Sequence, residues 1–182
     1  APPCVQDREA FMAMDYWAFD QSPEGVRSVS ERAECELEAA DLIRDYHEML
    51  RQRGEPVTFE YEGSTITMGE TGEVFILYWH EGQLRAFAGQ TDRAADLFRK
   101  SLKPEDQNFQ GWNQYALASI AFLEDDRVAL TAQRNELAER VPADNINLGV
   151  VDGLIACFGK SYSDAYGSDA CNRRPTGNPD AD

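Results

Sequence analysis

The chain has 182 residues, of which 42% are hydrophobic, and its 33 acidic against 17 basic residues give a formal net charge of −16. This hydrophobic share is typical of a folded domain and excludes a disordered tail. The negative charge repels phosphate backbones and so argues against nucleic-acid binding. The longest unbroken apolar run, Val74–Trp79, is far shorter than the roughly 20 residues that a membrane-spanning helix needs.

The N-terminal region is predicted to be mostly helical. Residues Gln6–Phe19 place their apolar side chains at helical spacing. Ser22-Pro23-Glu24 combines a capping serine, a first-turn proline and an early acid, which is typical of a helix start. The helical pattern continues to Arg51 with a predicted break near residues 30–34. It ends at Gly54, because a basic last turn followed by glycine is a common helix stop.

Residues 55–73 interrupt this helical pattern. Val57, Phe59 and Tyr61 alternate with polar residues, a turn follows at Gly63, and a second short segment of strand-forming residues comes after it. This pattern predicts a small β-hairpin-like insertion. Because two strands alone are marginally stable in water, we expect the insertion to lie on the helices.

From residue 73 onward the helical pattern returns and predicts three helix pairs. Their expected ranges are Glu73–Ala88, Thr91–Leu102, Phe109–Leu123, Asp126–Val141, Asn147–Phe158 and Ser161–Ala170. We expect residues 1–171 to form a single domain. Residues 172–182, which include two prolines, are expected to form a flexible tail.

Four cysteines occur, Cys4, Cys35, Cys157 and Cys171, and none belongs to a C-x-x-C pair, which argues against a zinc or thioredoxin-type site. Four cysteines allow three pairings. Because Cys157 and Cys171 flank a turn-rich stretch and Cys4 precedes one helix while Cys35 lies in another, we favour the pairs 4–35 and 157–171. Four reduced thiols in a cytosolic protein are the alternative.

The chain begins Ala-Pro-Pro-Cys without a basic and apolar leader, as a mature exported protein does after cleavage. Disulfides form and persist in oxidising compartments. Together with the cysteine count, these features favour a periplasmic or secreted location.

The C-terminal half repeats itself at about 35 residues. Small or turn-forming residues recur in three sets, Gly82, Ala118 and Gly153; Gly89, Asp125 and Gly159; and Ala94, Ala129 and Ala165. Small residues at these places allow paired helices to approach closely, which gives the period a physical reason.

This period resembles that of the tetratricopeptide repeat (TPR) family. The clearest unit follows that family's order of glycine, alanine-x₃-phenylalanine and proline at Gly82, Gly89, Ala94, Phe98 and Pro104. The likeness covers residues 74–170 and, weakly, 22–52, with Arg85 where a tyrosine is usual and Gln133 where an aromatic residue is expected. It implies an all-α fold of antiparallel helix pairs in a short, TPR-like right-handed array. An irregular helical bundle with chance spacing is the alternative.

In TPR-like stacks the first helix of each pair lines an inner groove that commonly holds peptides. The nearest matches to groove-lining positions are Trp79, Gln83, Arg85, Trp112, Tyr115 and Ser119. Tryptophan and tyrosine are good interface anchors because they offer a large contact area at a low entropic cost. Core packing is the alternative for Trp112 and Tyr115. Arg85 would pair with a carboxylate of a partner or with a neighbouring acid.

Sequence motifs for catalysis or cofactor binding are missing. The patterns G-x-S-x-G, G-x-x-x-x-G-K-[ST], G-x-G-x-x-G and H-E-x-x-H do not occur. The two histidines, His47 and His80, each precede a glutamate but lack a second histidine one turn away. We therefore expect no catalytic residue, no cofactor and no metal site. The alternative is a small hydrolase-like enzyme that uses carboxylates with His47 or His80 in a cleft between residues 55–73 and the helices.

The sequence favours a non-enzymatic module that binds a protein or peptide through the inner groove or through residues 55–73. The acidic surface would speed encounter with a basic partner. One form of this hypothesis is an inhibitor or immunity protein for a basic toxin or hydrolase. A structural subunit of an envelope assembly is a further alternative.

Overall fold

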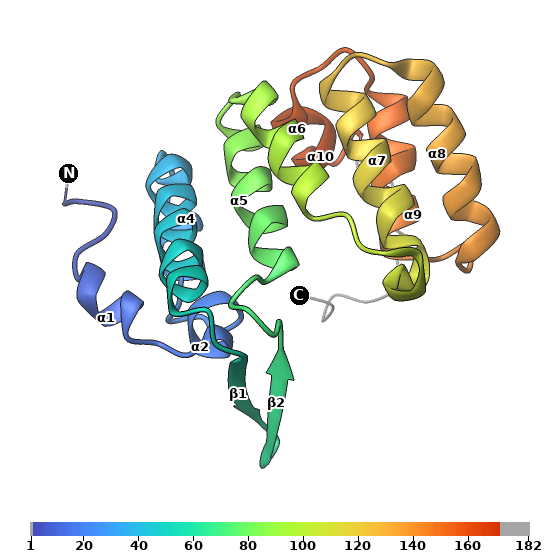
Figure 1. Cartoon of the computed structure of the whole chain (residues 1–182). Helices are drawn as coiled ribbons and strands as arrows, with labels where there is room; N and C mark the ends of the chain where they lie inside the picture. The colour runs from blue at the N-terminus through green and yellow to red at the C-terminus, as the bar shows by residue number, and fades with distance from the viewer. Residues whose placement is uncertain (1, 172–182) are drawn as a thin grey trace. The chain divides into compact units, whose positions relative to one another are not determined.

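The computed structural model of the chain describes residues 2–171 (Figure 1). The chain divides into two compact units, Ala1–Ser101 (unit 1) and Leu102–Asp182 (unit 2). The described part is mostly helical and contains one two-stranded antiparallel sheet, so the predicted helical class and hairpin are confirmed. The TPR-like array and the single domain over residues 1–171 stay predictions. The tail predicted from Asn172 lies outside the described residues.

The described residues of unit 1 form six helices and the hairpin. The helices are α1 Arg8–Met12, α2 Tyr16–Asp20, α3 Arg27–Ser30, α4 Glu36–Arg53, α5 Phe75–Phe87 and α6 Thr91–Lys100, and the strands are β1 Val57–Tyr61 and β2 Ser64–Met68. Helix α4 ends at Gly54 in the left-handed conformation, as predicted, and the break before α4, residues 31–35, extends one residue beyond the predicted 30–34 region.

The first helical stretch is more broken than predicted. The single helix expected over Gln6–Phe19 is wrong, because the Asp15 carboxylate accepts a hydrogen bond from the Ala18 N–H and starts a new helix, α2. The helix start predicted at residues 22–24 is also wrong, since these residues form a turn. A Cβ at Gly25 would lie 2.1 Å from the Phe19 carbonyl oxygen, so glycine is required where the chain folds back against α2.

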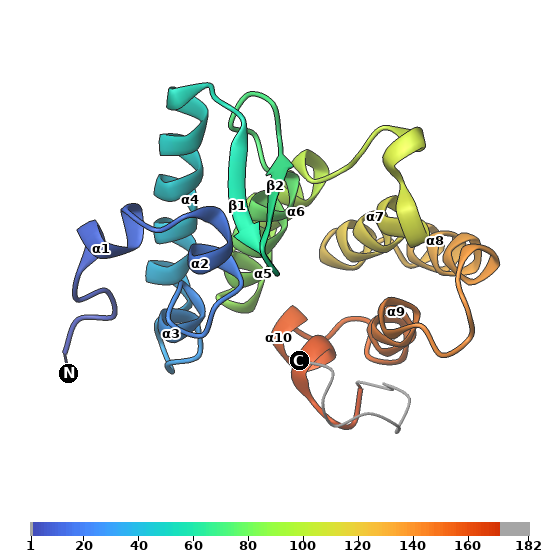
Figure 2. The ribbon, with the colours of Figure 1, turned by 90° about the horizontal axis from the view of Figure 1, so that it is seen from below.

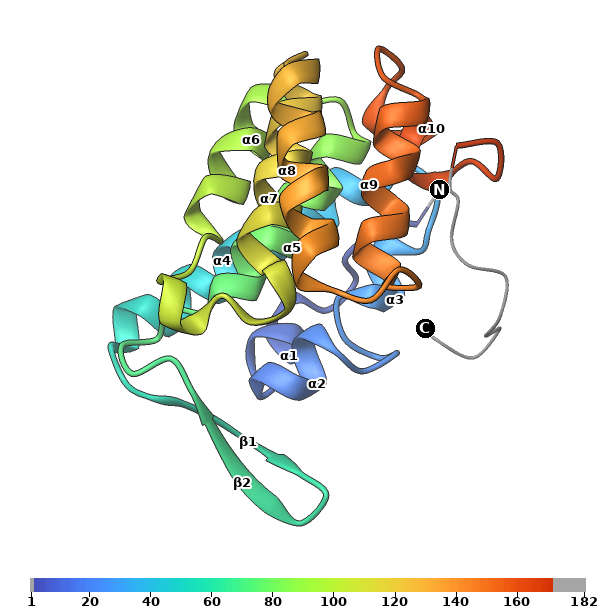
Figure 3. The same cartoon turned by 90° about the vertical axis from the view of Figure 1, so that its right-hand side faces the viewer.

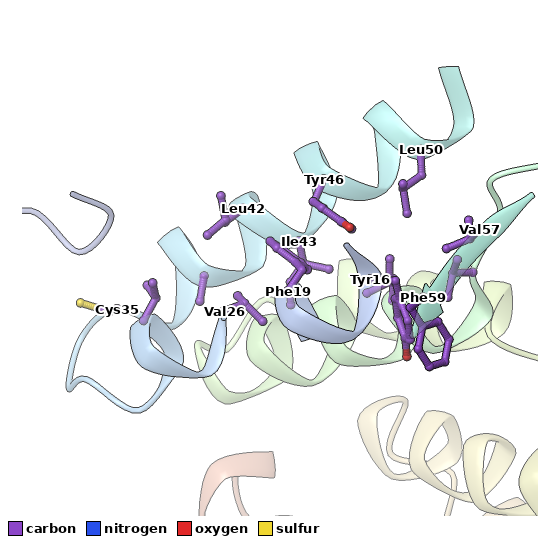
Figure 4. Close-up of a cluster of buried hydrophobic side chains, with 14 residues drawn as sticks. Tyr16, Phe19, Val26, Cys35, Leu42, Ile43, Tyr46, Leu50, Val57 and Phe59 are labelled. Carbon is purple, nitrogen blue, oxygen red and sulfur yellow. The ribbon is translucent and has the colours of Figure 1, made fainter. Parts of the chain in front are cut away.

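The core of unit 1 forms between α2, α4 and the hairpin (Figure 4). The ring of Phe19 from α2 stacks on that of Tyr46 from α4, with ring centres 3.8 Å apart. Residues Leu42 and Ile43 of α4 are almost completely buried in the same cluster. Helix α4 therefore supplies the apolar face on which the N-terminal helices are fixed.

Both predicted disulfides are confirmed. Cys4 is bonded to Cys35 in unit 1, and Cys157 is bonded to Cys171 in unit 2. The first joins the N-terminal segment to the start of α4. Two disulfides are consistent with an oxidising, extracellular compartment.

Helices α5 and α6 pack closely because of Gly82. A Cβ at this position would lie 2.7 Å from ring carbons of Phe98 in α6, so the small residue that the repeat predicted is needed for close approach. The turn between the two helices contains Gly89, whose φ is +80°, and the Gln90 N–H donates to the Arg85 carbonyl oxygen at 2.8 Å. A glycine with positive φ together with this hydrogen bond is typical of a helix end.

Unit 2 consists of helices with short connections. Its described helices are α7 Trp112–Leu123, α8 Arg127–Arg140, α9 Ile146–Ala156 and α10 Tyr162–Gly167, preceded by the 3₁₀ turns η1 Glu105–Gln107 and η2 Phe109–Gly111. Figure 2 shows α7, α8 and α9 packed beside one another. The helix predicted from Phe109 begins three residues later, because Gln110 and Gly111 have positive φ angles of 52° and 68°.

No helix within residues 2–171 combines the length and apolar character that crossing a bilayer requires.

His47 connects α4 to the start of α5. It is buried, its Nε2 accepts a hydrogen bond from the Val74 N–H at 2.9 Å, and its ring meets the edge of Tyr78. Burial and the nearby positive charge of Arg51 lower the pKa of His47 to about 4. The imidazole is therefore neutral at physiological pH and holds the backbone where the hairpin segment enters α5.

We expect this contact to make stability fall as the pH drops from 6.5 towards 4. Since the folded pKa of about 4 lies below the ordinary value of 6.5, the unfolded chain takes up the proton first and protonation favours unfolding. The contribution of His47 to the free energy of unfolding is fully present above pH 6.5. Roughly 2 kcal/mol of it is lost by about pH 4.5. Urea denaturation across this pH range measures the loss.

The matched variant is His47→Gln, whose amide oxygen can accept the same hydrogen bond without titrating. The difference in unfolding free energy between wild type and variant should narrow steadily below pH 6.5. A constant difference over the whole range would show that His47 does not titrate as described.

Candidate functional site

The hairpin presents one apolar and one polar face. In its register Val57 pairs with Met68, Phe59 with Ile66, and Tyr61 with Ser64. Since side chains alternate across a strand, these residues share one face, and the other face carries Thr58, Glu60, Thr65 and Thr67. The turn residues Glu62 and Gly63 both have positive φ, as in the turns that close tight hairpins.

The inner half of the apolar face anchors the hairpin to α2. Val57 and Phe59 are buried. The Phe59 ring stacks on Trp17, with ring centres 5.5 Å apart, and tilts against Tyr16 at 5.4 Å. Figure 4 shows Tyr16 from α2 beside Phe59 from β1. These contacts satisfy the expectation that the hairpin lies on the helices, because they supply the burial that two strands lack.

The outer half of the same face is exposed to solvent. Trp17 is 37% exposed, Tyr61 42% and Ile66 39%. The rings of Trp17 and Tyr61 are tilted against each other with centres 4.7 Å apart, and Ile66 lies across from the buried Phe59. We call these three residues the hairpin patch. Figures 1 and 3 show the hairpin extending beyond the helices of its unit.

The segment that carries the hairpin, residues 54–73, is strongly acidic. Residues 54–73 include no lysine or arginine and carry five glutamates, all exposed: Glu55, Glu60, Glu62, Glu70 and Glu73. Exposed carboxylates in the same segment as an apolar patch repel acidic partners and attract basic ones. The arrangement therefore suits a partner that offers apolar side chains together with lysine or arginine.

The predicted groove residues on α5 lie in unit 1. Trp79 is buried and stacks on Phe98, with ring centres 4.1 Å apart. Arg85 is buried as well: its Nε donates to Glu81 at 2.7 Å and its Nη2 to Asp41 of α4 at 2.8 Å. Gln83 is half-buried. Of the two partners considered for Arg85, the structure shows neighbouring acids, and the bond to Asp41 ties α5 to α4.

The predicted groove residues on α7 lie in unit 2. Tyr115 and Ser119 are buried, and the Ser119 hydroxyl donates to the Tyr115 carbonyl oxygen at 3.0 Å. Trp112 is half-buried, and the Lys103 ammonium lies 5.2 Å from the centre of its ring. A groove shared by α5 and α7 stays a prediction. Burial leaves Gln83 and Trp112 as the members of the set that a partner can touch directly.

The two histidines have different surroundings. The Nε2 of His47 accepts from the Val74 N–H and its ring contacts Tyr78, whereas the Nδ1 of His80 lies 2.7 Å from the carboxylate of buried Asp20, beside a pocket of about 180 Å³. Within residues 2–171, no three His, Cys, Asp or Glu side chains come together in a group that could hold a metal ion.

Sequence reasoning found the hairpin but missed the role of Trp17. Helical spacing placed Trp17 on the apolar face of a longer helix, whereas the break at Asp15 turns it towards β1. The apolar alternation of Val57, Phe59 and Tyr61 indicated a strand face that needed a cover. No local sequence pattern indicated that α2 is the element that packs on this strand face.

Comparison with known proteins identifies no relative of this chain. No family model matches the chain, and no match is found among curated proteins or among solved structures. The geometry and charge of the hairpin therefore define the candidate functional site.

The two halves of the apolar face should differ in their effect on stability. Phe59→Ala removes the buried ring that joins β1 to α2 and should lower the unfolding free energy by about 3 kcal/mol. Ile66→Ala, on the same face but partly exposed, should cost less than about 1 kcal/mol. Urea denaturation measures both values. Equal losses for the two variants would contradict the division into an anchoring half and an exposed half.

Proposed function

We propose that the protein is a binding module whose hairpin patch docks on a protein or peptide that presents apolar side chains flanked by lysine or arginine. The observation that carries the proposal is the group of exposed apolar residues, Trp17, Tyr61 and Ile66, in a segment with five glutamates and no basic residue.

The aromatic members of the patch are suited to anchoring. Trp and Tyr side chains give much contact area for few rotatable bonds. The stack on Phe59 holds Trp17 in place before a partner arrives, which lowers the entropy lost on binding. The five glutamates of residues 54–73 supply the complementary charge, which steers encounter at low salt and is screened at high salt.

An exported inhibitor or immunity protein for a basic toxin or hydrolase is one form of this proposal. The two disulfides and the net charge of −16 support that form. A structural subunit of an envelope assembly would use the same patch against other subunits. It would form a concentration-dependent oligomer, whereas a binding module for a separate partner would remain a monomer.

A small enzyme is the second candidate function, and one observation favours it. A buried carboxylate that holds one ring nitrogen of a partly exposed histidine, as Asp20 holds His80, is an arrangement that can orient a general base. His47 does not serve this alternative, because its Nε2 is occupied by the Val74 N–H.

A peptide library on beads tests the binding proposal, with the full chain and its disulfides intact as the probe. Library members vary independently in net charge and in apolar content. We expect enrichment of peptides that combine aromatic or branched apolar residues with lysine or arginine, and binding that weakens as salt rises. The double variant Tyr61→Ser/Ile66→Thr should abolish this enrichment.

The matched control is Val128→Thr, which removes an apolar side chain that is 83% exposed on α8 of unit 2. It should leave the enrichment unchanged. Enrichment of acidic or uncharged peptides would overturn the charge argument. Enrichment that persists in the Tyr61→Ser/Ile66→Thr variant, or disappears in Val128→Thr, would move the binding surface away from the hairpin.

A further inference from the structure

The pocket beside His80 has a polar wall that is built around a buried carboxylate. Asp20 Oδ1 lies 2.7 Å from His80 Nδ1, while Asp20 Oδ2 accepts from Gln21 Nε2 at 2.5 Å and from the Tyr16 hydroxyl at 3.3 Å. Burial and the Asp20 charge raise the pKa of Tyr16, so its hydroxyl remains a donor. Both oxygens of Asp20 are therefore engaged, and its carboxylate is not available to a ligand.

Helix α5 brings one stripe of side chains to this pocket. His80, Gln83, Leu84 and Phe87 follow the spacing i, i+3, i+4 and i+7, which places them on one helix face. The Nδ1 of His80 faces Asp20, so Nε2 is the ring nitrogen left for the pocket. The stripe thus offers polar groups at one end and apolar side chains at the other.

The opposite wall adds a cation. Arg27 of α3 lines the pocket, where its Nε donates to the Asp20 carbonyl oxygen and its Nη2 to Gln21 Oε1, both at 3.3 Å. Within residues 2–171, its Nη1 makes no hydrogen bond of its own. Val26 and Ile43 complete an apolar floor.

The residues that line the pocket indicate the chemical class of ligand that it can bind. Its one carboxylate, Asp20, is already engaged, whereas Arg27 and Gln83 present donors next to an apolar floor. The pocket volume is about 180 Å³. An apolar cavity of about 150 Å³ holds benzene, so this pocket can take an apolar group of similar size.

We propose that this pocket binds a small carboxylic acid with a branched or aromatic apolar body. Arg27 and Gln83 bind the carboxylate, and Val26, Ile43 and Leu84 surround the apolar body. Asp20 holds the His80 ring in the wall of the pocket. This site is separate from the hairpin patch and does not depend on the proposed function.

Binding at the two sites should depend differently on salt concentration. The chain as a whole is strongly negative, so long-range attraction does not bring an anion to the pocket, and the carboxylate is recognised by short-range hydrogen bonds. Binding of the acid should therefore not show the steep loss with salt that is expected for basic peptides on the hairpin patch.

The test is an NMR titration of the full, disulfide-bonded chain with 4-methylpentanoate and, as a neutral match, 4-methylpentanamide. Ligands of this size bind in about the millimolar range or tighter. The acid should give saturable amide shifts in residues 26–30 and 80–87 and bind about tenfold more tightly than the amide, since a charged hydrogen-bonded pair is lost in the amide.

Two pocket variants and one control make the result specific. Arg27→Gln should weaken binding of the acid about fivefold or more. Gln83→Glu, at a half-buried position, should also weaken binding, because the new carboxylate repels that of the acid. Arg53→Gln, which removes an exposed arginine elsewhere in unit 1, should leave binding unchanged.

Several outcomes would overturn the proposal: no saturable binding up to about 20 mM, equal affinity for acid and amide, shifts confined to other residues, or unchanged affinity in both pocket variants. None of these outcomes bears on peptide binding by the hairpin. Conversely, the Tyr61→Ser/Ile66→Thr variant should bind the acid as well as the wild type does.

Discussion

Two β-strands cannot bury enough surface to remain ordered in water by themselves, so the hairpin depends on the stack between Phe59 and Trp17. This contact also fixes the register of the hairpin on the helices. Since a slip of one residue would turn each side chain to the opposite face, burial of Phe59 commits Tyr61 and Ile66 to the exposed end of the apolar face. The exposed patch is thus a consequence of how the hairpin is anchored.

The anchor is firm because α2, which carries Trp17, is held on several sides. The Phe19 ring stacks on Tyr46 of α4, and Asp20 connects the end of α2 to His80 of α5. His47 fixes the backbone at Val74, where the hairpin segment leads into α5. The same contacts that fix α2 also form one wall of the pocket that we assign to a small acid, although the two surfaces recognise different chemistry.

The sequence predicted elements best where a local signal decides the outcome. Gly54 ended α4 as predicted, and strand alternation with a glycine turn located the hairpin. The break at Asp15 was missed because the apolar spacing around it favoured one continuous helix, while a side-chain cap was decisive. Only half of the candidate site was predicted. The strand face was found because its apolar residues alternate, but Trp17, which packs on it, lies about 40 residues earlier and belongs to no such pattern. Similarly, repeat spacing placed Arg85 on a helix without showing that Asp41 would neutralise it.

We propose that the hairpin patch is the surface that contacts a partner. Site-specific photo-cross-linking tests it most directly, with a photoreactive phenylalanine analogue at position 61 or, for comparison, at the exposed position 128 of unit 2. We expect illumination in the cells that produce the protein to link position 61, and not position 128, to a basic protein. Cross-links that form at position 128 alone, or to acidic proteins from position 61, would contradict it.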